Sequence, residues 1–370
     1  MDLYIDRDEL GRGLARIQGV VERRSTHPVL SHVLLHAQGE QLRMTATDAE
    51  VAFIGDFSAN ITTPGEVAID AASLFQVVRT LPDATVRLQL GAGHRLEITS
   101  GRAFFRLPGV AAEEYPPLPA FDPMGSIRVK EQDLRRQVER VAFAVSTDDT
   151  RYGLNGANLE QVDGDDGPLL RIVSTDGHRL SAADIPFTGE LVLTPRMLVP
   201  RKALAVIRKL LDGTGEISVE FGDAAMRLIR PGQTFWFRML DGEFPNVYAV
   251  VPTDGRHKVL VQRSTLTDTL KRVQVLVQER PRAVRFAFTE SELSAQVHDV
   301  DRGEVDETLP AELEGDPITI GFNSRYLADT LSVMSGERVL LEMGHSQAPC
   351  RVTDPDDSGA FYVIMPMRLD

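Results

Sequence analysis

The feature that most constrains this fold is a pattern of apolar residues that occurs three times along the chain. Each copy opens with a stripe spaced four, three and four residues apart, which places four side chains on one face of a helix. These stripes are Leu10, Leu14, Ile17, Val21; Leu134, Val138, Val141, Val145; and Leu266, Leu270, Val273, Val277. A shorter stripe, spaced four and three, follows in each copy: Leu74, Val78, Leu81; Ala203, Ile207, Leu210; and Leu327, Leu331, Met334. The repetition predicts three similar domains rather than one large core.

Between the paired stripes lie short segments in which apolar and polar residues alternate, as is typical of strands. Examples are residues 85–90, 216–221 and 284–288. We therefore predict an α+β fold of three repeated domains, each with two helices packed on antiparallel sheets. Proline-rich or turn-forming stretches separate the copies, which places the domains at residues 1–120, 126–252 and 256–370.

One turn is the most distinctive short motif. Residues 174–180, Ser-Thr-Asp-Gly-His-Arg-Leu, follow an alternating run, and Asp176-Gly177 favours a tight turn between strands. A weaker copy lies at residues 45–50, and Asp299 marks a third.

Asp176 and His178 could instead be an acid–base pair, which would make the chain an α+β enzyme. No activated serine or cysteine, metal-ligand spacing, Walker loop or dinucleotide glycine motif accompanies them, so we favour a structural turn and expect no active site, cofactor or metal.

The charge distribution points to a polyanionic partner. The formal net charge is −14, yet the six predicted helical segments hold 20 basic against 10 acidic residues. These segments are residues 7–24, 71–81, 130–146, 200–212, 263–282 and 323–336. Arg16, Arg140 and Arg272 each follow a stripe residue by two positions, about 200° around the helix, which predicts an outward position. A positive helical side on an acidic protein suits a nucleic acid held by its phosphates.

The single cysteine, Cys350, excludes an intrachain disulfide and fits a reducing cytoplasm. The N-terminal residues lack the pattern of a secretory signal, and no run approaches 18 apolar residues. We therefore expect a cytoplasmic protein without a membrane partner.

With these motifs in view, the chain resembles the bacterial sliding clamps, the beta subunits of DNA polymerase III, from Tyr4 to Leu369. The most specific matches are the turn at residues 174–180 and the terminal Met-Pro-Met-Arg-Leu at residues 365–369. The resemblance implies a head-to-tail homodimer that closes six domains into a ring around double-stranded DNA. It also implies a processivity factor, not an enzyme, which tethers the replicative polymerase, the clamp loader and repair proteins through short apolar peptides.

The resemblance also carries over site residues. Those implied to contact DNA are Arg24, Arg79, Tyr152, Arg201 and Lys202, while Asp148, Ala72 and Ser73 depart from the family's usual residues there. Those implied to form the peptide pocket are Leu154, Thr175, Gly177, His178, Arg179, Leu180, Pro245, Val250, Val363, Met365, Pro366, Met367 and Arg368. Arg179 and Arg368 would serve as polar anchors for the peptide.

The dimer interface implied by the resemblance joins the first and third domains. Phe105 and Leu107 would face Val275 and Leu276. The charged residues expected to pair across it are Arg95 and Arg102 with Glu304, Asp306 and Glu307.

Overall fold

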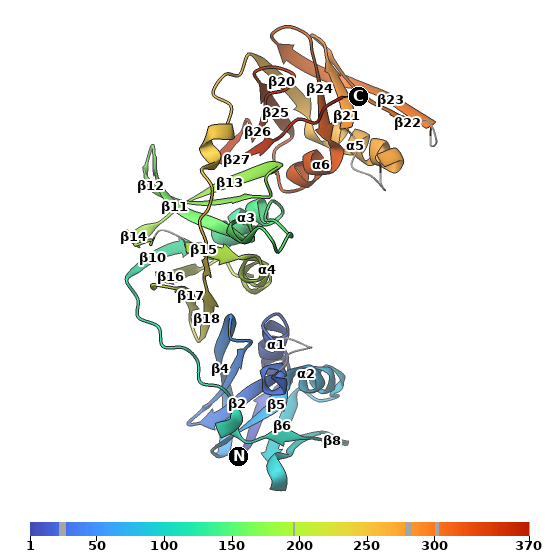
Figure 1. Cartoon of the computed structure of the whole chain (residues 1–370). Helices are drawn as coiled ribbons and strands as arrows, with labels where there is room; N and C mark the ends of the chain where they lie inside the picture. The colour runs from blue at the N-terminus through green and yellow to red at the C-terminus, as the bar shows by residue number, and fades with distance from the viewer. Residues whose placement is uncertain (22–26, 195–196, 278–282, 300–302, 370) are drawn as a thin grey trace. The chain divides into compact units, whose positions relative to one another are not determined.

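The computed structural model describes residues 1–21, 27–194, 197–277, 283–299 and 303–369. The order of its elements repeats three times: strand, helix, four strands, helix, three strands (Figure 1). The first copy comprises β1 (Asp2–Asp6), α1 (Arg7–Ile17), β2 (His32–Gln38), β3 (Gln41–Thr47), β4 (Val51–Thr63), β5 (Gly65–Asp70), α2 (Ala71–Thr80), β6 (Thr85–Leu90), β7 (Leu96–Ser100) and β8 (Ala103–Leu107).

The other two copies keep that order, except that the long fifth element of the second copy is split in two. The second comprises β10 (Gly125–Lys130), α3 (Glu131–Ala142), β11 (Gly156–Gly164), β12 (Gly167–Thr175), β13 (Arg179–Pro186), β14 (Thr188–Glu190), β15 (Met197–Pro200), α4 (Arg201–Leu210), β16 (Glu216–Phe221), β17 (Ala225–Arg230) and β18 (Gln233–Arg238). The third comprises β20 (His257–Gln262), α5 (Arg263–Val277), β21 (Ala283–Phe288), β22 (Glu292–Asp299), β23 (Gly303–Glu314), β24 (Ile318–Asn323), α6 (Ser324–Ser332), β25 (Arg338–Met343), β26 (Cys350–Asp354) and β27 (Asp357–Ile364). Two short strands, β9 (Gly109–Val110) and β19 (Leu240–Asp241), follow the first and second copies.

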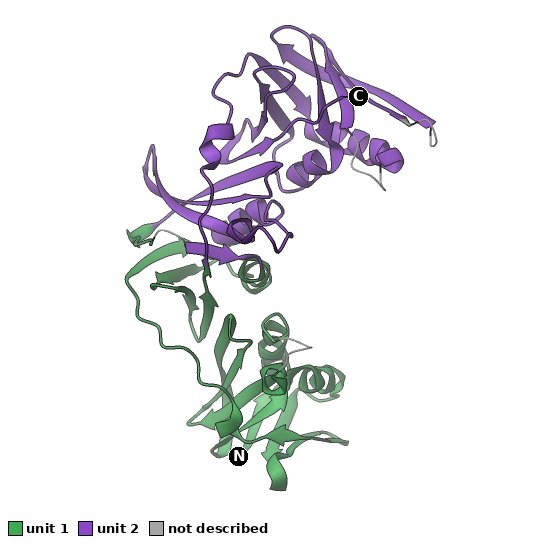
Figure 2. Ribbon diagram, in the orientation of Figure 1, with its two compact units in different colours: residues 1–132, 188–194, 202–240 green, residues 133–187, 195–201, 241–370 purple. Residues whose placement is uncertain are grey.

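The chain divides into two compact units, residues 1–132, 188–194 and 202–240, and residues 133–187, 195–201 and 241–370 (Figure 2). The first unit is built on a 14-stranded sheet in which β18 pairs with β4, and the second on a 13-stranded sheet in which β27 pairs with β13. In both cases the last strand of one copy joins the sheet of the copy before it. The predicted domain boundaries at 1–120, 126–252 and 256–370 stay a prediction.

The helices bury the predicted stripes. In the first unit α1 packs on α2, and in the second α5 packs on α6. Leu10 and Leu14 of α1 and Leu266 and Leu270 of α5 are fully or almost fully buried. Asp6, Asp70 and Asn323 cap α1, α2 and α6 by accepting hydrogen bonds from first-turn backbone N–H groups.

The stripes overestimate helix length. Four of their last residues lie beyond the helix: Val21, Leu81, Val145 and Met334. Leu81, Val145 and Met334 are nevertheless at most 5% exposed. An apolar pattern reports which side chains face the core, whereas a helix ends where its backbone hydrogen bonds end, and the two need not coincide.

Candidate functional site

The turn between β12 and β13 is a structural turn, as predicted. Thr175 Oγ1 donates to the carbonyl of Arg179 at 2.6 Å and accepts from Gly177 N at 3.0 Å. Asp176 Oδ1 accepts from the backbone N–H groups of His178 and Arg179 at 2.9 and 3.1 Å. Gly177 has φ of 88°, a left-handed conformation that glycine adopts without strain. The Asp176 carboxylate therefore stabilises the turn and is not held for proton transfer.

The predicted weaker copy has the same hydrogen bonds. Thr47 Oγ1 donates to the carbonyl of Val51 and accepts from Ala49 N, both at 3.0 Å. Asp48 Oδ1 accepts from Glu50 N and Val51 N at 2.9 and 2.7 Å. The two turns are thus one structure used in two copies. The third turn, after Asp299, involves residues outside the described part of the chain.

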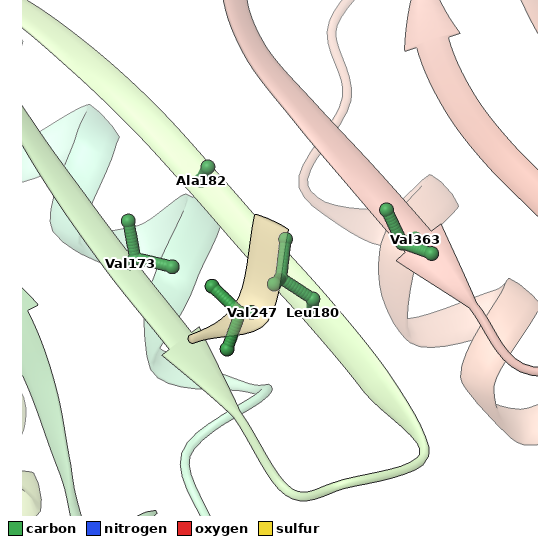
Figure 3. Close-up of a cluster of buried hydrophobic side chains, with 5 residues drawn as sticks. All are labelled: Val173, Leu180, Ala182, Val247 and Val363. Atoms are coloured by element: carbon green, nitrogen blue, oxygen red, sulfur yellow. The ribbon is translucent and has the colours of Figure 1, made fainter. Parts of the chain in front are cut away.

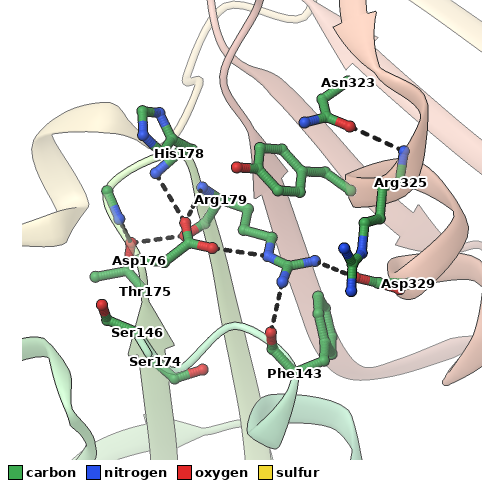
Figure 4. A network of polar contacts seen from close by, with 12 residues as sticks. Phe143, Ser146, Ser174, Thr175, Asp176, His178, Arg179, Asn323, Arg325 and Asp329 are labelled. Carbon is green, nitrogen blue, oxygen red and sulfur yellow. Dashed lines mark hydrogen bonds and ion pairs between the residues drawn. The ribbon is translucent and has the colours of Figure 1, made fainter. Parts of the chain in front are cut away.

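The side chain of Arg179 ties this turn to the third copy (Figure 4). Its Nε donates to Asp176 Oδ2 at 3.0 Å, Nη1 to Asp329 Oδ2 at 2.6 Å, and Nη2 to the carbonyl of Phe143 at 2.7 Å. The guanidinium carbon lies 4.6 Å from the centre of the Tyr326 ring. With all three nitrogens engaged, Arg179 is not available as the free polar anchor expected from the sequence.

An apolar cluster lies beside the turn, where β13 pairs with β27 (Figure 3). Its buried members are Val173, Leu180, Ala182, Val247 and Val363. Leu180 and Val363, both predicted, are direct cross-strand partners. The sequence comparison missed the other three, although Val173 and Ala182 could have been found from their place beside the turn in alternating strands.

The C-terminal segment continues from β27 past the turn. Met365 N donates to the carbonyl of His178 at 2.9 Å, and Met367 N donates to the carbonyl of Gly321 at 2.8 Å. A Cβ at position 321 would lie 2.5 Å from the Met367 carbonyl oxygen, so only glycine permits this approach. The structure therefore brings two predicted stretches, far apart in sequence, into direct contact.

Four predicted residues of this segment, 365–368, line a hollow of about 620 Å³. The wall is completed by Arg285, Thr319, Gly321, Ser346, Gln347 and Leu369, none of which was predicted. Arg368 is exposed, and its role as a polar anchor stays a prediction.

The remaining predicted pocket residues, Leu154, Pro245 and Val250, come from two loops. The loops approach closely, because a Cβ on Gly153 would lie 2.4 Å from the Glu243 carbonyl oxygen. Val250 is 37% exposed and follows the buried Val247 within one 3-10 turn, Val247–Val250. These loops supply exposed apolar surface in the unit that also holds the cluster and the C-terminal segment.

Two tyrosines of this unit are held in their protonated form. Burial raises the pKa of Tyr326. Burial and a hydrogen bond to Glu160 raise the pKa of Tyr248 to about 12. Neither phenol is poised to exchange a proton near neutral pH.

The residues implied to contact DNA have different surroundings. Arg24 lies outside the described residues. Arg79 and Arg201 are exposed, and Tyr152 is 75% exposed. Lys202, in contrast, forms an ion pair with Asp48, whose side chain is 1% exposed. The lysine thus ties the second copy to the turn of the first.

The predicted outward position of the helix arginines is wrong for two copies. The Arg16 side chain is 17% exposed and pairs with Asp212 at 3.3 Å; the Arg140 side chain is 3% exposed and pairs with Asp357. Each carboxylate comes from the next copy along the chain, so the face opposite the stripe meets a neighbour instead of water. Of the three arginines, only Arg272 fits the prediction, because its side chain is 57% exposed. It pairs with Glu307 of its own copy.

The charged side chains expected at the dimer interface are partly engaged within the chain. Glu307 accepts from Arg272 Nε at 2.8 Å, and this pairing holds the pKa of Glu307 below its ordinary value. Asp306 accepts from Ser294 and Gln296 at 2.9 and 3.0 Å. Val275, a predicted interface residue, is 62% exposed, and Phe104, next to the predicted Phe105, is 55% exposed.

The described residues contain no group of histidine, cysteine or acidic side chains arranged to hold a metal. None of the helices described is both long and apolar enough to cross a membrane.

Three repeated α+β copies, joined through shared antiparallel sheets, define a protein of the DNA-clamp class. The chain matches the DNA polymerase III beta subunit N-terminal domain over residues 1–119, its central domain over 128–246 and its C-terminal domain over 248–368. It is 34% identical to the beta sliding clamp of Caulobacter vibrioides over the full length of both chains. The chain therefore belongs to the DNA polymerase III beta subunit family, the bacterial beta sliding clamps.

Solved structures agree with this assignment. The beta sliding clamp of C. crescentus superposes with a TM-score of 0.93 at 32% identity, covering 100% of this chain and 99% of that one. The clamp of Bartonella birtlesii, solved with griselimycin bound, gives 0.92 at 30% identity over the whole of both chains. As a member of this family the chain is a sliding clamp, a processivity factor for DNA polymerase without catalytic activity of its own.

Proposed function

We propose that this chain works as a head-to-tail homodimeric ring that encircles double-stranded DNA. The ring tethers the replicative polymerase, the clamp loader and repair proteins through an apolar peptide pocket. The observation that carries the pocket is the junction of β13 and β27, where Leu180 faces Val363 and Met365 N bonds to the His178 carbonyl. The two stretches that resemble the family most closely, residues 174–180 and 365–369, meet at this junction, which supports a single site there. A cytoplasmic location, expected from the single cysteine, is part of the same proposal.

The proposed pocket keeps the residues carried over by resemblance, with Arg368 as its polar anchor and Arg179 as a residue that holds the turn. Its apolar wall is supported by the cluster around Leu180 and Val363, and its mouth by Val250 and the hollow lined by Met365–Arg368. Flexible methionine side chains can adapt to partners of different shape. A short peptide with two or three apolar side chains would bury enough surface for micromolar affinity after its ordering cost is subtracted.

The ring proposal is supported by two unpaired strand edges. At each junction within the chain, the last strand of one copy pairs with the fourth strand of the copy before: β18 with β4, and β27 with β13. Among the described residues β8 pairs only with β7, and residues 303–310 of β23 pair only with β22. By the same rule, β8 of one chain could pair with β23 of a second chain, because they are the last strand of the first copy and the fourth strand of the third. Two such head-to-tail interfaces would close two chains into a ring. Phe105, Leu107, Arg95 and Arg102 would then approach Val275, Leu276, Glu304, Asp306 and Glu307.

The proposed DNA contacts are Arg24, Arg79, Tyr152, Arg201 and Lys202. Arg201 on α4 is exposed, as are Arg208 and Lys209, and no ion pair to any of these three occurs among the described residues. Unneutralised cations suit phosphate contacts that do not read sequence. Because Asp48 already engages Lys202, we expect Lys202 to contribute less to DNA binding than Arg201.

The pocket is tested with a peptide of the Gln-Leu-x-Leu-Phe type and calorimetric titration. Val250→Asp should weaken binding about tenfold or more, because it places a charge among apolar groups that the peptide must desolvate. Ala249→Asp adds the same charge one residue earlier in the 3-10 turn and faces about 120° away, so it should bind as the unmodified chain does. Removal of residues 365–370 should abolish binding. Unchanged affinity in both the Val250 variant and the truncated chain would place the peptide elsewhere.

A further inference from the structure

The two junctions between copies correspond residue by residue. At one, Arg179 and Leu180 of β13 face Ile364 and Val363 of β27. At the other, Val51 and Ala52 of β4 face Phe237 and Trp236 of β18. The bond from Met365 N to the His178 carbonyl at 2.9 Å has its counterpart from Arg238 N to the Glu50 carbonyl at 2.7 Å. Ala52 and Trp236 therefore occupy the places of Leu180 and Val363.

The linkers that follow the copies correspond as well. Tyr115-Pro116 and Phe244-Pro245 occupy the same place in the repeat, so Leu118 corresponds to Val247 and Phe121 to Val250. At the second junction, Val250 leaves apolar surface open, since it is 37% exposed. The proposed peptide pocket lies there.

At the first junction the chain itself covers the corresponding surface. Leu118 and Phe121 pack against a cluster of Ala52, Ala225 and Trp236. Arg227 lies on β17, opposite Trp236 of β18. Its guanidinium carbon is 4.2 Å from the centre of the Phe121 ring. Val247, the counterpart of Leu118, is likewise buried at the second junction. The two junctions therefore differ three positions further on, where Phe121 packs on the cluster and Val250 is 37% exposed.

Side chains, not backbone bonds, hold this linker. Residues 116, 117 and 119 are prolines, which have no N–H to donate, and residues 116–123 have no regular secondary structure. Among the described residues, the next backbone hydrogen bond along the chain is from Met124 N to the Phe221 carbonyl at 2.8 Å. The segment is therefore attached like a bound peptide, through Leu118 and Phe121.

Trp236 supplies an independent observation. Its side chain is buried, with 8% of the residue exposed, and its indole N–H has no acceptor among the described residues. Buried indole donors usually have a partner. A peptide carbonyl seated across β18 would supply one, which the linker in its present position does not.

We propose that the first junction is a second apolar-peptide site, held closed by Leu118 and Phe121 of the chain's own linker. Its ligand is a short peptide with two apolar side chains three positions apart, and the linker occupies it in cis. The inference rests on the proposed function, because the second junction, which is exposed at Val250, is the counterpart to which the first is compared.

Trp236 is the only tryptophan of the chain, so its fluorescence reports on this junction alone. Replacing Leu118 and Phe121 together by alanine should shift the emission to longer wavelength and raise acrylamide quenching about twofold, because the two side chains no longer cover the cluster that contains Trp236. Ala120→Ser, on an exposed neighbour of the same linker, should change neither. Circular dichroism and light scattering establish that fold and oligomeric state are kept; the single variant Phe121→Ala serves if the double variant loses either.

A synthetic peptide with the sequence of residues 115–124 then tests binding. Added to the double variant, it should restore the emission of the unmodified chain in a saturable way, with a dissociation constant of about 10–1000 µM. It should leave the unmodified chain unaffected, where the linker competes at high effective concentration. Unchanged quenching in the alanine variants, or an emission that no peptide concentration restores, would overturn the inference. Loss of peptide binding by Val250→Asp belongs to the other junction and leaves the Trp236 signal unaltered, so the two proposals fail separately.

Discussion

At the scale of single residues, the arginines of the first helices show how neighbouring copies reuse one position. Arg16 and Arg140 both meet a carboxylate of the next copy, Asp212 and Asp357. A buried guanidinium is stable only with such a partner, since an unpaired buried charge is strongly destabilising. Two copies therefore use this position as a junction contact. Arg272 has no following copy in its own chain and stays 57% exposed.

The Arg140–Asp357 pair predicts a dependence of stability on pH. The Arg140 hydrogen bond holds the pKa of Asp357 below its ordinary value. A depressed carboxyl pKa stabilises the folded state above the unfolded value of about 3.9, and that contribution is lost as the pH falls through the folded pKa. Asp357→Asn should lower the free energy of unfolding by about 3 kcal/mol at pH 7, because Arg140 is left buried and unpaired.

Urea unfolding at pH values between 2 and 7 checks this expectation. The gap between the unmodified chain and Asp357→Asn should be constant above about pH 5 and narrow toward pH 2, since the carboxyl becomes neutral. Asp356→Asn, on the exposed neighbouring carboxylate, is the matched control and should stay close to the unmodified chain throughout. A gap of the same size at pH 2 would show that the ion pair is not its cause.

At the scale of elements, sheet edges decide how copies combine. Strands β18 and β27 close the two junctions inside the chain, whereas β8 has only one partner among the described residues. An unpaired strand edge offers backbone donors and acceptors to another chain. The exposed apolar residues Phe104 and Val275 lie on elements that the proposed dimer would bring together.

Val275→Asp with Leu276→Asp should therefore convert dimers to monomers at micromolar concentration. The two carboxylates would have to be desolvated on α5 at the interface with β8, which opposes association. Light scattering gives the mass directly. Met124→Asp places a charge on a 41% exposed apolar residue of the linker between the first and second copies and should leave the dimer intact. Persistence of the dimer in the double variant would contradict the interface.

At the scale of the whole molecule, an acidic protein is proposed to hold an acidic polymer. The chain carries a net charge of −14, yet Arg201, Arg208 and Lys209 of α4 are exposed together. Many helix cations are neutralised locally, as Arg135 is by Glu139 and Lys271 by Asp268. Weak contacts at a few free cations are suited to a ring that must slide along DNA.

Removing α4 cations should change the salt dependence of DNA binding. Arg201→Ala and Lys209→Ala should each weaken binding to duplex DNA and lower the slope of log K against log salt by about 0.9, as expected for one lost phosphate contact. Lys202→Met is the matched control on the same helix, because Lys202 already pairs with Asp48; it should lower thermal stability more than it changes the slope. Fluorescence anisotropy over a salt series measures all three. Equal slopes for Arg201→Ala and the unmodified chain would remove α4 from the DNA contacts.

The sequence by itself determined the threefold repeat, the α+β class, the buried stripes and the turn at residues 174–180, because these depend on local spacing and local hydrogen bonds. It also indicated the two stretches that meet where β13 pairs with β27, the place of the proposed pocket, but not Val173, Ala182 or Val247 of the cluster there. Only the tertiary structure decided that Arg140 is buried, that Arg179 is fully bonded and that Lys202 binds Asp48. The partners of these cations lie 217, 150 and 154 residues away. A periodic pattern shows which side of a helix is polar, but whether that side meets water or a carboxylate of the next copy depends on how the sheets join.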